Sequence, residues 1–422
     1  MQISSKISFA KLCVVLFSCL FISLISKAAA TERQSIVAQF YTAQNESIYW
    51  LSSSKRVAKA SEWLKAIDAA DNLGIVSNNL LNDQIRAVLK SRETISNETR
   101  SQTDKLITTV ILKFIQTLQE GNIVFAYNEV STSHDSDYIQ QLLQSQRRSV
   151  PKLVAKLDCK DAEYLTLKRY LHDSLPALST DKFKALAMAM NYRRFLSINQ
   201  EVNCIVVNIP EAEAIYYKEN KPILTMRTVV GKKSNPTPTI ASHITSIVTF
   251  PYWNVPHSIA VKEILPKVQK DDNYLEQNNF EVVDAKNNVV DDADLNWKKY
   301  DADNFPYFFR QSTGAGNSLG VLKFNLENPF SIFLHATSWQ GVFEKENRFL
   351  SHGCIRLEKP FDLANELMNG KLDIEKLKSD KENTEPKTYR LDAPLQTFII
   401  YNLVQVNGKK ITFLDDVYKL VK

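Results

Sequence analysis

The hydrophobic pattern changes its period near Gln200, and this change divides the chain into two parts of different architecture. Before it, apolar residues such as Val57, Ala60 and Leu64 recur every three or four positions, the period of an amphipathic helix. After it, short segments such as Cys204–Asn208 are typical of strands. A chain of 422 residues is also too long for one ordinary core. We therefore expect a multidomain protein in which an all-α part precedes a mostly β part.

Turn and cap residues predict where several elements begin and end. The apolar stripe from Leu106 to Leu118 predicts a helix that begins at Thr103, a residue type favoured at helix starts, and ends at Gly121. In the second part, Glu219-Asn220 and Asn407-Gly408 are residue pairs that favour tight turns between antiparallel strands.

Between the strand segments lies a stretch of different character. His257–Leu265 predicts a short helix, which Pro266 should stop because proline lacks the N–H that a helix interior needs. The following residues, Asp271–Lys299, are polar and acid-rich and show little periodicity. Pro360–Met368 predicts a further helix, with proline in its first turn.

The first 30 residues have the composition of a secretory signal peptide. Lys6 and Lys11 form its charged start, Leu12 to Ile25 its apolar core, and Ala28 to Ala30 a small-residue cleavage site. The apolar run is shorter than the roughly 20 residues that a membrane-spanning helix needs. We therefore expect residues 1–30 to be removed, with no stable membrane insertion afterwards.

Charge and cysteine content narrow the partners and the chemistry. Loss of the three lysines in residues 1–30 lowers the formal net charge from +5 to +2, and no basic run remains to favour nucleic acid. Cleavage would leave Cys159, Cys204 and Cys354, an odd number, so at least one thiol stays free even in an oxidising compartment. Cys159 and Cys204 either form a disulfide or are buried as small hydrophobic side chains.

Cys354 lies in the run Ser351-His352-Gly353-Cys354-Ile355-Arg356, with His335 upstream. A thiol attacks as its thiolate and needs a proton acceptor, for which His335 and His352 are candidates. Gly353 has no Cβ, so the chain can turn sharply enough for the N–H groups of Gly353 and Cys354 to point at one oxygen. Such a pair is an oxyanion hole for acyl transfer. The alternative is a zinc site of His335, His352 and Cys354, although the spacing lacks a compact ligand pair.

The flanking segments predict which side chains share the cleft. Ser331–His335 is typical of a short strand, whose alternation places Phe333 and His335 on one face. If the chain is extended from Cys354 onward, Cys354 and Arg356 share a face as well. A thiol, an imidazole, an aromatic ring and a guanidinium together suit an anionic, peptide-like acyl substrate. Arg356 either binds a carboxylate of that substrate or pairs with a structural carboxylate.

At these residues the chain resembles a known family. His335, followed after fifteen residues by Ser-His-Gly-Cys, is similar to the signature of L,D-transpeptidases, the peptidoglycan cross-linking enzymes with a YkuD-like catalytic domain. The wider context resembles their large Gram-negative, YcbB-type branch, and the resemblance covers about residues 185–413. The matching stretches are Met226–Gly231, Pro251–Pro256, Lys262–Pro266, Asn304–Tyr307 and Leu319–Phe324.

The resemblance implies a specific order of domains. After the signal peptide, it implies a helical scaffold domain over residues 31–198 and a mostly β L,D-transpeptidase catalytic domain over residues 199–422. An α/β cap is expected as an insertion over residues 257–320. Relatives usually carry a small peptidoglycan-binding module after the scaffold, but Asp158–Ser174 runs almost directly into the next helical pattern and leaves no room for it. An exported protein of this branch is expected in the periplasm.

The resemblance also implies roles for individual residues. It makes Cys354 the nucleophile and His335 the base, with His352 orienting the catalytic loop and Gly353 contributing to the oxyanion hole. The backbone carbonyl of Ala336 is expected to hold the imidazole of His335. The residues expected to contact substrate are Phe333, Arg356, Trp253, Tyr252, Ser351 and Ala336.

The implied reaction needs neither cofactor nor metal. Cys354 would attack the carbonyl of the third residue of a peptidoglycan stem tetrapeptide and release the terminal D-alanine. An amine of a second stem would then resolve the thioester to a 3→3 cross-link, and carbapenem-type inhibitors would acylate the same thiol. Two alternatives remain open from the residues: hydrolysis of the thioester, as in an L,D-carboxypeptidase or an amidase, and a non-catalytic wall-binding protein.

Overall fold

The computed structural model describes residues 36–76, 83–90, 96–130, 134–379 and 385–421. The chain forms two compact units, a helical unit that extends to Ile198 and a barrel unit that begins at Asn199. Two short stretches cross this division, because Val124–Ser131 belongs to the barrel unit and Val406–Ile411 to the helical unit. The domains expected over 31–198 and 199–422 therefore differ from these units at the two stretches, each of which belongs to the other unit. The expected signal peptide lies outside the described residues.

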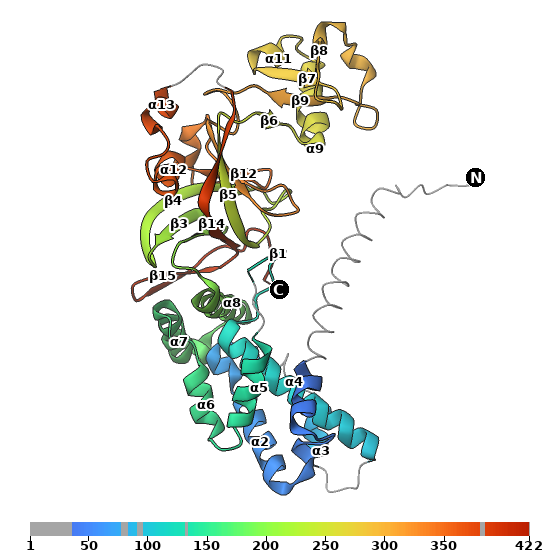
Figure 1. The fold of residues 1–422 in the computed structure, drawn as a ribbon, viewed down its shortest axis with the longest axis vertical. Helices are drawn as coiled ribbons and strands as arrows, with labels where there is room; N and C mark the ends of the chain where they lie inside the picture. Colours follow the sequence, from blue (N-terminus) through green and yellow to red (C-terminus); the bar gives the residue numbers. More distant parts are fainter. Residues whose placement is uncertain (1–35, 77–82, 91–95, 131–133, 380–384, 422) are drawn as a thin grey trace, which may run out of the picture. The chain divides into compact units, whose positions relative to one another are not determined.

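The helical unit contains helices of 8 to 24 residues, drawn in blue to green in Figure 1. They are α2 (Ser54–Asp68), α3 (Asp83–Lys90), α4 (Asn97–Glu120), α5 (Asp135–Gln144), α6 (Val150–Leu157), α7 (Ala162–Ser174) and α8 (Thr180–Asn199), with the 3₁₀ turns η1 (Trp50–Ser52), η2 (Ala70–Leu73) and η4 (Leu175–Ala177). Residues 36–44 are helical as well. Only residues 178 and 179 separate η4 from α8, so no glycan-binding module is inserted in this stretch.

Helix α4 begins earlier than the sequence predicts. Its N-cap is Ser96, whose side-chain oxygen accepts the N–H of Thr99, whereas the expected cap Thr103 is fully buried inside the helix. The first two turns are mostly polar, so the apolar period does not reveal them. Gly121 ends the helix as predicted.

The aromatic side chains of the helical unit belong to its core. Trp50 and Trp63 are fully buried, and their indole N–H groups donate to Thr108 and Ser145. Asp104, also fully buried, accepts the backbone N–H groups of residues 49 and 51 at 2.8 and 2.7 Å. These bonds attach the turn η1 to α4 and satisfy the buried carboxylate, which would otherwise be costly to desolvate.

The barrel unit is built on a ten-stranded sheet. Its strands are β1 (Tyr127–Asn128), β2 (Cys204–Asn208), β3 (Glu213–Lys218), β4 (Lys221–Gly231), β5 (Ile240–Thr249), β10 (Leu322–Leu326), β11 (Leu334–His335), β12 (Phe349–Ser351), β13 (Ile355–Leu357) and β14 (Lys387–Ile400). Their order is β1-β5-β10-β11-β13-β4-β3-β2-β14, with β12 beside β4. Because β14 pairs with β5 as well as with β2, the sheet closes into a barrel. Figure 1 shows β3, β4, β5 and β14 along one side of it.

Local sequence explains the connections of the barrel. Glu219 and Asn220 both have positive φ, 53° and 61°, and join β3 to β4 as the predicted tight turn. Asn407 and Gly408 likewise lie at the turn of a separate hairpin, β15 (Val404–Asn407) and β16 (Lys410–Phe413). Helices α12 (Pro360–Met368) and α13 (Ile374–Ser379) follow β13 along the chain.

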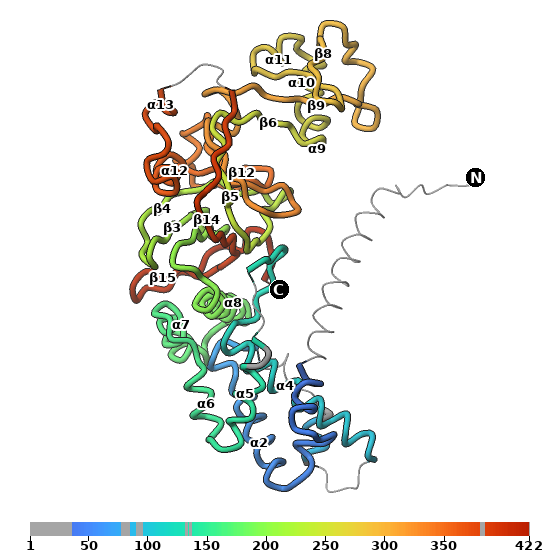
Figure 2. Tube along the Cα trace, viewed as in Figure 1, coloured from blue at the N-terminus to red at the C-terminus, as the bar shows by residue number. Residues whose placement is uncertain are grey.

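The cap is a small domain of its own, traced in yellow and orange in Figure 2. Its sheet has the order β6-β9-β7-β8, from β6 (Trp253–Asn254), β9 (Phe308–Gln311), β7 (Phe280–Val283) and β8 (Val289–Val290). The remaining elements are α9 (His257–Ile259), the π-helical segment η5 (Ala260–Ile264), α10 (Leu265–Val268), α11 (Tyr274–Gln277) and the 3₁₀ turns η6 (Asp292–Asp294) and η7 (Trp297–Lys299). Its hydrophobic core includes Val255, Ile259, Leu265, Phe280 and Phe309.

The structure differs from the sequence expectations for the cap at two points, the helix end at Pro266 and the start at residue 257. Pro266 does not stop the helix, which continues to Val268, because a π-helical segment of wider hydrogen bonding precedes the proline. The acid-rich stretch Asp271–Lys299 contains α11, β7 and β8, although its periodicity is weak. The sheet also begins at Trp253, slightly before the expected start of the cap at residue 257.

Within the described residues, no helix is both long and apolar enough to cross a membrane.

Candidate active site

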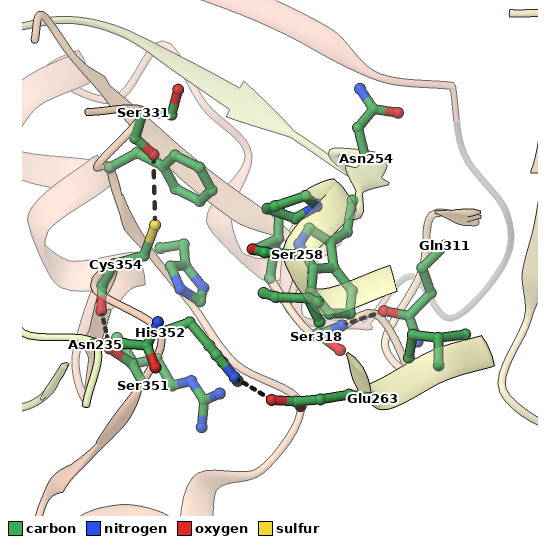
Figure 3. A pocket seen from close by; sticks show the side chains of 18 of the residues that line it. Asn235, Asn254, Ser258, Glu263, Gln311, Ser318, Ser331, Ser351, His352 and Cys354 are labelled. Carbon is green, nitrogen blue, oxygen red and sulfur yellow. Dashed lines mark hydrogen bonds and ion pairs between the residues drawn. The ribbon is translucent and has the colours of Figure 1, made fainter. Parts of the chain in front are cut away.

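A cavity of about 760 Å³ lies between the cap and the barrel strands that carry the Cys-His motif. Cys354, His335, His352, Phe333, Arg356, Trp253 and Ser351 all line it, together with cap residues such as Glu263 and Phe280. The volume falls in the range of pockets that enclose small organic ligands. Figure 3 shows Cys354 and His352 facing Glu263 and Ser258 across this space. Seven of the ten site residues expected from sequence therefore border one cavity.

The loop between β12 and β13 presents the thiol, and its own hydrogen bonds hold it. The Ser351 hydroxyl donates to the carbonyl of Cys354 at 2.6 Å and accepts the N–H of Gly353 at 3.1 Å. The carbonyl of Gly353 accepts from the Thr237 hydroxyl at 2.7 Å. Gly353 has φ +121°, and a Cβ there would come within 3.0 Å of Ile332 Cδ1. A larger residue would therefore distort the loop that carries Cys354.

One expected oxyanion donor is otherwise engaged. The N–H of Gly353 donates to the Ser351 hydroxyl within the loop, so it is not free to donate to a substrate oxygen. The reason is local, because the Ser351 side chain lies two residues before this N–H and closes a tight turn around it. The described part of the chain offers no acceptor to the N–H of Cys354, which is left as the oxyanion donor of this loop.

His335 is held in the protonation state of a base. Its Nδ1 lies 2.6 Å from the carbonyl oxygen of Ala336. A carbonyl can only accept, so Nδ1 carries the proton and Nε2 is left with its lone pair. Burial, followed by the positive charge of Arg356, lowers the pKa of His335 to about 3, so the imidazole is neutral near pH 7. Ala336 contributes this carbonyl and does not itself line the cavity.

His352 is engaged by the cap. Its Nε2 lies 2.6 Å from a carboxylate oxygen of Glu263 in the π-helical segment, as Figure 3 shows, and 3.2 Å from Nζ of Lys232. The shorter contact requires Nε2 to donate, so this nitrogen is not free to accept the proton of the thiol. Burial would raise the pKa of Glu263, but the hydrogen bond from His352 and the charge of Lys232 outweigh it and lower the pKa. Thus His335, and not His352, has a ring nitrogen available to accept a proton, and His352 connects the catalytic loop to the cap.

The thiol of Cys354 contacts the turn that precedes β11. Sγ of Cys354 lies 3.7 Å from the carbonyl oxygen of Ser331, which has φ 57°. The side chain of Asn328 holds this turn, since its oxygen accepts the N–H groups of Phe330 and Ile332 and its amide donates to the Ile332 carbonyl. The turn shortens the strand expected over 331–335, because a residue with positive φ cannot continue a strand.

The thiol is uncharged in the resting site, although positive groups surround it. Burial raises the pKa of Cys354, while the backbone N–H of Phe333 and the charges of Lys323 and Arg356 act in the opposite direction. Arg356 forms no ion pair within the described part of the chain, and its buried Nε has no acceptor. A structural carboxylate partner for Arg356, one of the two readings of the sequence, is therefore absent from these residues.

Of the aromatic residues expected at the site, Phe333 and Trp253 line the cavity, whereas Tyr252 does not. The rings of Phe333 and His335 lie 5.5 Å apart, which fits their shared strand face. Trp253 lines the cavity and packs on Phe280 of the cap. Tyr252 does not line it, since its ring packs against the Arg310 guanidinium 4.8 Å away. Adjacent residues of an extended chain point to opposite sides, so only one of the two can face the cleft.

The sequence left open whether Cys159 and Cys204 form a disulfide. Cys159 and Cys204 are buried and do not form a disulfide, so the disulfide alternative is wrong. Sequence reasoning missed Glu263, Lys323 and Asn328 as site residues. The only signal for Lys323 is a charged residue inside an apolar strand pattern, and nothing in the sequence links Glu263 to His352, 89 residues away. In the described part of the chain, no three His, Cys, Asp or Glu side chains are grouped as metal ligands.

Comparison with known families agrees with this geometry. Residues 203–375 match the model of the L,D-transpeptidase catalytic domain, of the YkuD type, and residues 35–171 match a scaffold domain. A Haemophilus influenzae protein named "Putative L,D-transpeptidase" is 36% identical over 236 residues, an alignment that covers 55% of this chain and 47% of that protein. The chain thus spans about half the length of this curated relative.

Solved structures of L,D-transpeptidases give weaker matches. The Ldtfm–avibactam carbamoyl enzyme is 14% identical with a TM-score of 0.21, over 47% of this chain and 49% of that chain. The C442S mutant of the Enterococcus faecium L,D-transpeptidase is 13% identical with a TM-score of 0.19, over 47% and 50%. These TM-scores are too low to support an argument about fold or mechanism.

The stretch that matches the catalytic-domain model includes the residues that line the cavity at Cys354 and His335. The matched stretch 203–375 contains the thiol, the neutral imidazole and the loop that holds them. The helical unit and the closed barrel correspond to the scaffold and catalytic models in the same order along the chain. The chain therefore contains an enzyme domain, an L,D-transpeptidase catalytic domain of the YkuD type, preceded by a scaffold domain.

Proposed function

We propose that this protein is an L,D-transpeptidase of the large, YcbB-type branch that forms 3→3 cross-links between peptidoglycan stem peptides. The observation that carries the proposal is the grouping, in one cavity, of a thiol, a neutral imidazole and a guanidinium that has no counter-ion among the described residues. These groups supply a nucleophile, a base and an anion site, the three functions that acyl transfer from an anionic peptide requires.

Acylation proceeds by proton transfer and attack at one carbonyl. The thiol proton of Cys354 passes to Nε2 of His335, and sulfur forms a bond to the carbonyl carbon of the third stem residue. The C–N bond to the terminal D-alanine then breaks, and its nitrogen takes the proton back from His335. The N–H of Cys354 stabilises the oxyanion of the tetrahedral intermediate, since a preorganised donor is worth several kcal/mol in a water-poor site.

Arg356 is proposed to hold a carboxylate of the donor stem. Its planar guanidinium matches a carboxylate with two parallel hydrogen bonds, and it has no competing partner within the described residues. Phe333 and Trp253 provide apolar walls beside it. These cavity residues are proposed to supply affinity for the donor stem.

The second half-reaction needs an amine in place of water. The nitrogen of a diamino acid on a second stem attacks the thioester carbon and loses a proton to Nε2 of His335. The C–S bond then breaks, and the sulfur takes that proton to return the thiol. Water is far more abundant than any amine, so transfer wins only where the site positions the amine and limits water. The cap forms one wall of the cavity and is suited to that task. The proposal places the enzyme in the periplasm, on the basis of the signal-like residues 1–30.

Product analysis tests the proposal. The purified protein is incubated with stem tetrapeptide, and the products are separated by chromatography and identified by mass. We expect a 3→3 dimer and free D-alanine, both lost in Cys354→Ala. If only tripeptide forms, the protein is an L,D-carboxypeptidase and not a transpeptidase. If the tetrapeptide is unchanged, the result favours a non-catalytic wall-binding protein.

A further inference from the structure

Lys323 lies on the same face of the barrel as the catalytic pair. In β10 its neighbours Leu322 and Phe324 are buried on the other face, while Lys323 is partly exposed. The strand register places Lys323 directly opposite His335, and His335 opposite Arg356. Residues paired in this way share a face of the sheet. Lys323, His335 and Arg356 therefore form one row across three neighbouring strands, next to Cys354.

The ammonium group of Lys323 has no anionic partner in the described part of the chain. Its Nζ lies 4.3 Å from the centroid of the Phe333 ring, and no ion pair or hydrogen bond joins it to another described residue. Burial lowers the pKa of Lys323, which shows that the group gives up part of its hydration. A partly desolvated cation beside an aromatic face is stabilised further by any anion that forms nearby.

Two anions can form near Lys323 during the reaction, a carboxylate of the donor and the thiolate of Cys354. Phe333 and Cys354 line the cavity but Lys323 does not, so the ammonium is not placed to contact a ligand there. The charge of a Cys354 thiolate, in contrast, interacts favourably with Lys323. His335 is neutral in the resting site and supplies no positive charge to the thiolate there. The geometry thus favours the thiolate as the partner of Lys323.

We propose that Lys323, together with Arg356, supplies the positive charge that stabilises the Cys354 thiolate. His335 then acts as a proton carrier, which takes the thiol proton and returns it to the leaving nitrogen. Lys323 acts on the reaction indirectly, because its charge stabilises the Cys354 thiolate and the side chain does not contact substrate. The inference rests on Cys354 as the nucleophile of the proposed function, but it does not depend on which acyl donor or acceptor is used.

A neutral alkylating reagent isolates this effect from substrate binding. The full chain is treated with iodoacetamide between pH 5 and 10, and the rate of modification of the Cys354 peptide is followed by mass spectrometry. Lys323→Met removes the charge and keeps a long side chain on Phe333. An opposite charge near a titrating group commonly shifts its pKa by about one pH unit or more. We expect the alkylation profile of Lys323→Met to move up by about one pH unit, with a roughly tenfold slower rate at pH 7.

Two controls separate charge from packing. Lys323→Arg keeps the positive charge and should retain the wild-type profile. Lys345 has the same kind of contact elsewhere, with Nζ 4.3 Å from the centroid of the Trp339 ring, and Lys345→Met should not change the profile. An unshifted profile in folded Lys323→Met would overturn the proposal, and so would an equal shift in Lys323→Arg. Should Lys323→Met fail to fold, Lys323→Gln carries the same test. Because iodoacetamide needs no transpeptidase activity, the result stands apart from product analysis.

Discussion

The contact between Glu263 and His352 predicts that the cap controls the reactivity of the catalytic loop. Glu263→Gln keeps the size of the side chain and removes its charge, so the ion pair with Lys232 and the charge-assisted bond from His352 are both lost. The three side chains are 40%, 37% and 30% exposed, respectively, and exposed pairs contribute about 1 kcal/mol or less each. Together the two contacts amount to ~1–2 kcal/mol, which corresponds to a roughly 5- to 30-fold change in an equilibrium or a rate.

The measurement is the rate of carbapenem acylation, followed by intact mass. Glu263→Gln should acylate roughly 5- to 30-fold more slowly, because His352 and the loop beside Cys354 lose their attachment to the cap. Added salt should slow the wild type towards the variant and leave the variant nearly unchanged, since it screens exposed charges. Glu344→Gln is a matched control, because Glu344 also pairs with a cation, Arg227 at 2.8 Å, but does not line the cavity. A wild-type rate in folded Glu263→Gln would refute the reasoning.

Acid should release the same contact. The pKa of Glu263 is lowered in the folded protein, so its contribution to stability is present above the ordinary pKa of a glutamate and is lost as the pH falls through the lower folded value. Between pH 6 and 8 the carboxylate stays charged. The difference between wild type and Glu263→Gln should therefore persist over that range and disappear in strong acid, as measured by thermal unfolding of both proteins.

Three further outcomes are expected. Carbapenem should add once to the chain, and Cys354→Ala should lose the adduct with an unchanged circular dichroism spectrum; an adduct that persists would remove Cys354 as nucleophile. His335→Ala should slow acylation by roughly 10²- to 10⁴-fold, and the wild-type pH profile should lack an inflection near 6.5 because the pKa of His335 is about 3; a wild-type rate in folded His335→Ala would remove His335 as the base. Asn328→Ala should slow acylation by loosening the Ser331 turn, with a Tm reduced by a few degrees; equal rates would show that this turn does not position the thiol.

The division into two architectures and the grouping of the candidate site residues in one cavity could be predicted from sequence because both depend on local pattern. The change of period near Gln200 coincides with the boundary between the two units. The positions of Cys354, His335 and Arg356 follow from the alternation of short strands, which the structure retains. The Ala336 carbonyl that holds the imidazole was expected from the family resemblance alone, and the structure contains that bond.

The remaining features depend on contacts between segments distant in sequence. Glu263 reaches His352 only because the cap folds over the barrel, and Lys323 acquires its neighbours only through the register of β10 and β11. The hydrogen bond of Gly353 to Ser351 was missed for another reason. A glycine allows several directions for its N–H, and the side chain beside it selects one. Tyr252 and Trp253 were both assigned to the cleft, although neighbouring residues of an extended segment face opposite sides.

The most direct test of the account is to trap the covalent intermediate. The protein is mixed with stem tetrapeptide, quenched in acid within the first turnovers and examined by intact mass and peptide mapping. We expect one adduct on Cys354, whose mass equals the tetrapeptide acyl group without its terminal D-alanine. An added amine acceptor should discharge this adduct as cross-linked dimer. Cross-linked product without any adduct, or an adduct on a residue other than Cys354, would contradict the account.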